Sequence, residues 1–101
     1  MRLSQTALKV LKMFVENSGK SFSGADIAKV TGAGSGTLYP LLARFEAMGW
    51  AISEWEEVDP RQAGRPRKRL YRLTIQGRTK AHTALADLQV PAAVGGLLWI
   101  A

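Results

Sequence analysis

The sequence predicts a mainly helical fold with a small β-hairpin, and two observations lead to it. Apolar residues recur at helical spacing over residues 5–17, 23–30, 35–48 and 75–89. Two segments of strand character, 50–58 and 69–74, flank a loop rich in Arg, Gly and Pro. The resulting order of elements is that of a winged helix-turn-helix, with a three-helix bundle, a two-stranded wing and a C-terminal helix.

The first helix is predicted to place Leu8, Leu11 and Val15 on one face, with Phe14 beside them. Gly19 then suits the left-handed residue that commonly follows a helix. Ser21-Phe22 leaves room for only a very short extended piece before the second helix.

The second helix begins with a predicted capping box. The Ser23 hydroxyl can accept a bond from an early backbone N–H, while the Asp26 carboxylate reaches back to the start of the helix. We expect Ile27 and Val30 to face the core.

The third helix is expected to begin with Ser35 as its cap and to end at Gly49. Its core stripe consists of Leu38, Leu41, Leu42, Phe45 and Met48. The opposite face carries Gly36, Pro40, Ala43 and Ala47, and is therefore small and nearly uncharged. Such a face allows the backbone to approach something large.

The two strands should pair antiparallel, with Tyr71 and Leu73 facing inward and Arg72 outward. Thr74 can cap the last helix, in which Gly77 is a weak position. Pro91 is predicted to end that helix, and an uncharged apolar tail follows it.

Composition limits the possible functions. The chain has 101 residues, a net charge of +6, no cysteine and a single histidine, His82. These counts exclude disulfides, thiol nucleophiles and multi-histidine metal sites, and we expect no cofactor. No catalytic constellation stands out, so we do not expect an enzyme. The chain lacks a signal peptide and the roughly 18–20-residue apolar run of a membrane span, which predicts a cytoplasmic protein that does not meet a membrane.

The distribution of charge indicates double-stranded DNA as the partner. Residues 61–80 contain basic side chains and no acidic ones. Arginines on a Pro-stiffened hairpin tip suit a narrow minor groove, and the third helix suits the major groove. The candidate DNA-binding residues are Ser35, Gly36, Thr37, Tyr39, Arg44, Arg65, Pro66, Arg67, Lys68 and Arg69. Two alternatives stay open, since Tyr39 could pack at the edge of the core and Arg44 could form an ion pair with Glu46 or another acid.

Two blocks of sequence resemble PadR-like transcriptional regulators. Ser35-Gly36-Thr37-Leu38-Tyr39-Pro40-Leu41-Leu42, followed by Arg44-Phe45-Glu46 and Gly49-Trp50, resembles the third helix of that family. The run from Gly64 to Thr74, with Gly77-Arg78, resembles its wing and second strand. The resemblance implies a winged-helix repressor that binds operator DNA as a homodimer, and in many members a small aromatic effector releases the DNA. It places DNA contacts at Ser35, Gly36, Thr37, Tyr39, Arg65, Pro66, Arg67 and Lys68.

The C-terminal end departs from the family, whose members place a long helix or a helical domain after the wing. We divide the chain into a DNA-binding domain, residues 1–78, and a segment, residues 79–101, that packs or dimerises. The apolar tail is expected to lie against the first helix of its own chain or of a partner. Two other functions remain as hypotheses: a protein-interaction adaptor, and an effector-binding regulator whose pocket is lined by Trp50, Trp55 and Trp99.

Overall fold

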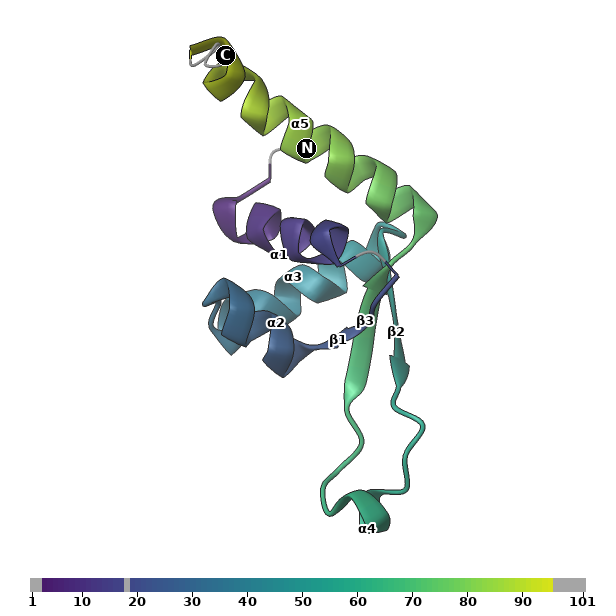
Figure 1. Ribbon diagram of the computed structural model, residues 1–101. Coiled ribbons are helices and arrows are strands. Elements are labelled where there is room, and N and C mark those ends of the chain that lie inside the picture. The colour runs from purple at the N-terminus through teal and green to yellow at the C-terminus, as the bar shows by residue number, and fades with distance from the viewer. Residues whose placement is uncertain (1–2, 18, 96–101) are drawn as a thin grey trace.

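The computed structural model describes residues 3–17 and 19–95, and for residues 88–95 it describes the backbone alone. Its elements are α1 (Gln5–Glu16), β1 (Phe22–Ser23), α2 (Gly24–Thr31), α3 (Ser35–Ala47), β2 (Ala51–Trp55), α4 (Pro60–Ala63), β3 (Arg69–Leu73) and α5 (Ile75–Gly95). Figure 1 shows α1, α2 and α3 gathered beside the sheet, with the β2–β3 hairpin projecting away from them and α4 at its tip. The predicted mainly helical fold with a small antiparallel hairpin is confirmed.

The sheet has three strands in the order β1-β3-β2, and both pairings are antiparallel. The predicted pairing of the hairpin strands is confirmed, with Ala51 opposite Leu73 and Trp55 opposite Arg69. The short β1 strand is an addition to the two strands that we predicted. It covers the free edge of β3 only at Leu70 and Tyr71, near the helices, so the outer part of the hairpin projects as a wing.

The core lies between α1, α2, α3 and the inner face of the sheet. Its largest fully buried side chains are Phe45, Leu11, Ile27, Leu38, Leu42 and Val10. Most of the predicted α3 stripe is confirmed as buried, as are Tyr71 and Leu73 of β3, whereas Met48 is half-buried.

The predicted face of α1 is confirmed in part. Leu11 and Phe14 are buried, and Val15 is half-buried and packs against the core. Leu8 is only half-buried, and the buried stripe also contains Ala7, Val10 and Met13. Periodicity gives the spacing of a buried face, but the partners that pack on a helix decide which arc is covered.

The inward orientation predicted for Val30 is wrong, because that side chain is 67% exposed. Ile27 and Ala28 occupy the narrow contact of α2 with the core, and Val30 borders a surface hollow beside α1.

Most of the predicted helix ends are confirmed. The capping box of α2 is present, with the Ser23 hydroxyl accepting from Asp26 N at 3.1 Å and Ser23 N donating to the Asp26 carboxylate at 3.4 Å. Gly19 and Gly49 both have positive φ. The cap predicted for α3 is wrong, because Gly34 is the N-cap and Ser35 is already the first helical residue.

The last helix is longer than predicted. We expected it to end at Pro91, but α5 continues to Gly95. Pro91 lacks the amide hydrogen for one helical hydrogen bond, but the chain on either side of it keeps its helical conformation here.

The division between residues 78 and 79 falls inside α5 and stays a prediction. The predicted packing of the tail and of Trp99 lies outside the described residues. Within the described part of the chain, no helix is long and apolar enough to cross a membrane.

Candidate nucleic-acid interface

Helix α3 buries one face and exposes the other. Leu38, Leu41, Leu42 and Phe45 hold it against the core. The exposed residues of its outer face are Ser35, Gly36, Thr37, Tyr39, Pro40, Ala43, Arg44 and Ala47. Only one of these carries a charge, so another molecule can approach most of this face without displacing long side chains.

Tyr39 packs at the edge of the core and is also partly exposed, so its contact with DNA stays a prediction. The residue is 47% exposed. The ring also lies against the backbone of Gly24, the first residue of α2, where a methyl group would overlap the Tyr39 hydroxyl. The side chain is therefore fixed between the two helices while it presents part of its surface outward.

Arg44 is exposed and does not pair with Glu46. The ion pairs among residues 3–17 and 19–87 join Lys12 to Glu16 and Arg65 to Glu56. The Glu46 carboxylate instead accepts a hydrogen bond from the Ser53 hydroxyl at 2.8 Å. The ion-pair alternative for Arg44 is thus not formed, and its contact with DNA stays a prediction.

A chain of side-chain contacts joins α3 to the wing. Ser53 of β2 donates to Glu46 of α3 and accepts from Arg69 Nε at 2.9 Å. The Arg69 guanidinium lies over the ring of Trp55, 5.2 Å from its centroid. We name Glu46, Ser53, Arg69 and Trp55 the helix–wing relay.

The relay is not evident from the sequence. Ser53 and Glu46 are ordinary polar residues until the strand register places Ser53 on the same face of the hairpin as Trp55 and Tyr71. The signal that could have found Ser53 is alternation, since Ala51 and Ser53 share the inner side of β2.

Glu56 organises the outer part of the wing. Its carboxylate accepts two bonds from the Arg65 guanidinium, at 2.6 and 3.1 Å, and a third from Lys68 N at 3.2 Å. The hydrogen bonds from Arg65, and then that from the Lys68 backbone, lower the pKa of Glu56 from 4.5 to about 2. The same contact raises the pKa of Arg65. We name Glu56, Arg65 and the Lys68 amide the wing clasp.

The tip of the wing is a short helix, whereas the sequence predicts a loop there. Asp59 caps α4 by accepting from Arg61 N at 2.9 Å, and Gly64 ends it in the left-handed region with φ 70°. Arg67 then donates through Nε to the Val58 carbonyl at 2.9 Å. Residues 61–69 are all exposed.

The predicted site residues thus fall into two groups on one molecule. Ser35, Gly36, Thr37, Tyr39 and Arg44 lie on α3, and Arg65, Pro66, Arg67, Lys68 and Arg69 lie on the wing. The relay holds the two groups in a fixed relation. Basic side chains crowd the β3 limb of the wing, whereas the β2 limb carries Glu54, Glu56, Glu57 and Asp59.

The tryptophans do not come together as the effector hypothesis required. Trp50 stacks on Phe45 with ring centroids 5.7 Å apart and is 9% exposed. Trp55 lies at the other end of β2 and is 58% exposed. Trp99 lies outside the described residues. Among the residues that are described, no three His, Asp or Glu side chains gather to hold a metal ion.

Comparison with known proteins places this geometry in a family. The model of the transcriptional regulator PadR-like family matches residues 25–83. The fold is similar to that of a PadR family transcription regulator from Clostridium difficile, with a TM-score of 0.74 and 19% identity over 97% of this chain and 100% of that chain. It is also similar to a PadR-like transcription factor from Bacteroides fragilis, with a TM-score of 0.70 and 20% identity over 91% of this chain and 87% of that one.

A third similar structure is BpsR of Bordetella bronchiseptica, whose DNA binding is regulated by 6-hydroxynicotinic acid. Its TM-score is 0.63 and its identity 26%, over 93% of this chain and 58% of that one. No curated protein matches the sequence.

Proposed function

Since the chain belongs to the PadR-like family of transcriptional regulators, we propose that it represses transcription as a homodimer bound to a two-fold operator. Members of this family are DNA-binding regulators and not enzymes. The observation that carries the proposal is the helix–wing relay. It joins a helix with a small, almost uncharged outer face to a strongly basic hairpin limb.

In this arrangement α3 enters the major groove and the wing reaches the adjacent minor groove. The outer face of α3 presents small groups at Ser35, Gly36 and Thr37, so the first turn can approach base edges and phosphates closely. Arg67 and Lys68 reach the DNA from the wing. Arg65 holds the wing in shape through the clasp and adds positive charge beside them.

Fluorescence anisotropy at several salt concentrations tests the DNA contacts. One duplex carries the region upstream of the protein's own gene, and a scrambled duplex serves as its comparison. We expect tighter binding to the upstream duplex and a steep salt dependence, in which each phosphate contact contributes about 0.9 to the slope.

Arg67→Ala is expected to weaken binding to both duplexes. It should also reduce the salt slope by about 0.9, the contribution of one phosphate contact. Lys12→Ala is the matched control, because Lys12 lies on α1 and pairs only loosely with Glu16 at 4.0 Å. Unchanged binding by Arg67→Ala would remove the wing from the interface. Weak, salt-insensitive binding to both duplexes would favour the adaptor hypothesis.

Repression itself is tested with a reporter driven by the upstream region. Because the bound protein occupies the operator, we expect reporter output to fall when the chain is supplied in trans. A rise in output would assign an activator instead.

The dimer is proposed to form through α5 and the residues that follow it. The support is that α5 packs on α1 and continues well past it, as Figure 1 shows. A dimer reads two half-sites about 34–36 Å apart. Light scattering is expected to give twice the chain mass for the full chain, and the monomer mass after deletion of residues 91–101. An unchanged dimer mass after that deletion would move the interface elsewhere.

We also propose that a small aromatic effector releases the DNA. The support is the structural likeness to BpsR. The probe is 6-hydroxynicotinic acid, added to the preformed complex with the upstream duplex. A concentration-dependent fall in anisotropy supports an effector of this class, and a flat response argues against this compound as the releasing ligand.

A further inference from the structure

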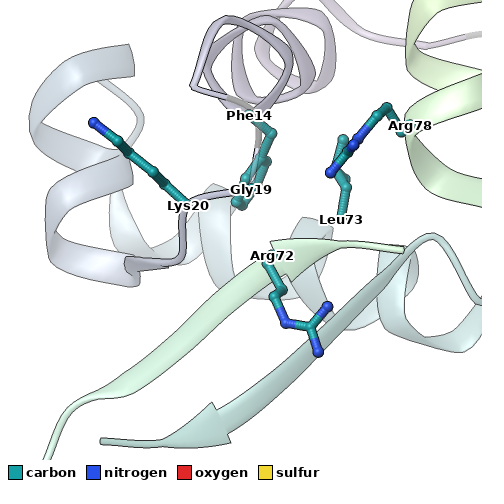
Figure 2. Close-up of a pocket in the computed structure, with 6 residues that line it drawn as sticks. All are labelled: Phe14, Gly19, Lys20, Arg72, Leu73 and Arg78. Atoms are coloured by element: carbon teal, nitrogen blue, oxygen red, sulfur yellow. The ribbon is translucent and has the colours of Figure 1, made fainter. Parts of the chain in front are cut away.

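A cavity lies on the side of the molecule away from the wing tip, where α1, β3 and α5 meet. Its volume is about 180 Å³, and it is lined by Phe14, Gly19, Lys20, Arg72, Leu73 and Arg78. These residues come from the end of α1, the loop after it, the end of β3 and the first turns of α5. Figure 2 shows the Phe14 ring and Leu73 at its centre, with the three basic residues around them.

The lining is positively charged and contains no acid. Lys20, Arg72 and Arg78 belong to neither of the ion pairs among the described side chains. None of the three side-chain heads makes a hydrogen bond within that part of the chain. Three cations that share a rim without a compensating carboxylate leave a site of positive potential.

The three side chains differ in where they point. Arg78 is half-buried, and Figure 2 shows it reaching from α5 across Leu73 toward Phe14. Lys20 and Arg72 are exposed and extend outward on opposite sides of the rim. Both side chains have long stems with the rotatable bonds needed to turn toward the cavity.

This cavity is separate from the proposed DNA interface. Arg72 alternates with Tyr71 and Leu73 along β3, so it lies on the face of the sheet opposite to α3. Tyr71 and Leu73 are buried, whereas Arg72 faces solvent.

We propose that the cavity binds a small oxyanion, a carboxylate or a phosphate group. Arg78 is its principal ligand, and Lys20 and Arg72 close over the anion from the rim. The planar guanidinium of Arg78 can hold two oxygens at once, and the apolar floor strengthens that contact by excluding water on one side. The proposal does not depend on DNA binding.

The test is a titration of the ¹⁵N-labelled full chain with inorganic phosphate, and separately with sodium acetate, at constant ionic strength and pH. We expect saturable shifts of the backbone amides of Gly19, Leu73 and Arg78. Because a charge-assisted hydrogen bond contributes more than a neutral one, Arg78→Gln is expected to lower the affinity for the anion by about tenfold or more. Arg61→Gln is the matched control, since Arg61 is an exposed arginine at the wing tip.

Lys20→Gln is the second variant, because Lys20 lies in an exposed loop and its replacement is expected to leave the fold intact. It is expected to weaken binding less than Arg78→Gln does. Saturation by phosphate alone assigns a phosphate ligand, and saturation by both salts assigns oxyanions in general. Shifts that grow without saturation, or that occur equally at the wing, overturn the proposal. So does an affinity that Arg78→Gln and Lys20→Gln leave unchanged.

Discussion

Replacing Gly77 by alanine tests the joint between α3, β2 and α5. In a helix, Gly→Ala ordinarily stabilises by about 1 kcal/mol, and from the sequence alone Gly77 is a weak position. The structure reverses that expectation. A Cβ at Gly77 would overlap the carbonyl oxygen of Trp50, and it would lie 2.7 Å from the carbonyl carbon and 2.9 Å from Cα of Trp50. All three are backbone atoms, which cannot rotate away.

The magnitude follows from what must move. Thr74 N donates to Trp50 O at 2.9 Å, and the Thr74 hydroxyl donates to Gly49 O at 2.7 Å while accepting from Gly77 N at 2.9 Å. Pushing α5 off Trp50 stretches these bonds. Overpacking costs about 1–3 kcal/mol, and each weakened hydrogen bond adds about 0.5–1.5 kcal/mol. After subtraction of the helix gain, Gly77→Ala is expected to destabilise by at least about 1.5 kcal/mol.

Urea denaturation followed by circular dichroism at one fixed protein concentration measures the effect. Gly36→Ala is the control, because it is also a helical glycine and nothing lies within 4 Å of an added Cβ there. The control is expected to be neutral or up to about 1 kcal/mol more stable. If Gly77→Ala matched its control, the close approach of α5 to Trp50 would be refuted.

Three further outcomes follow from contacts described above. The carboxyl ¹³C shift of Glu56 should titrate with a pKa of about 2, which lies below the ordinary value of 4.5. The clasp therefore stabilises the wing fully above pH 4.5, and this stabilisation is lost as the pH falls toward 2. In Arg65→Gln the pKa of Glu56 should rise toward 4.5, and an unmoved pKa would contradict the clasp. Ser53→Ala should weaken binding to the upstream duplex, as measured by anisotropy. Its free energy of unfolding in urea should change by less than about 1 kcal/mol. Unaltered binding would show that the relay does not position the wing. Val30→Lys should change urea stability by no more than about 0.5 kcal/mol, because the side chain is 67% exposed, and a loss of several kcal/mol would restore Val30 to the core.

Local signals in the sequence predict much of this fold. The bonds between Ser23 and Asp26, and between Thr74 and Gly77, join residues three positions apart, so the pattern of residue types alone identifies them. The buried stripe of α3 is equally local, because its spacing defines one helix face. The candidate residues of the interface lie on these same elements, which is why the sequence could name them.

The contacts that organise the interface join residues that are far apart in the sequence. Ser53 meets Arg69 only through the register of two strands, and Glu56 meets Arg65 across the wing. β1 is too short to carry a pattern of its own and forms because β3 offers a free edge. For Val30 the local pattern misleads. Its spacing from Ile27 predicts a buried side chain, but the contact of α2 with the core does not extend to it.

These non-local contacts bear on how the protein can meet DNA. The joint at Thr74 fixes the base of the hairpin, the relay fixes its middle to α3, and the clasp fixes its outer part. A wing held at three levels keeps its distance from α3 before DNA arrives, so binding orders few additional bonds and loses less entropy. We therefore expect Ser53 and Glu56, neither of which carries positive charge, to influence DNA affinity by setting the geometry of the wing. Because they read no base, we expect their effect to be similar on every DNA sequence of suitable groove spacing.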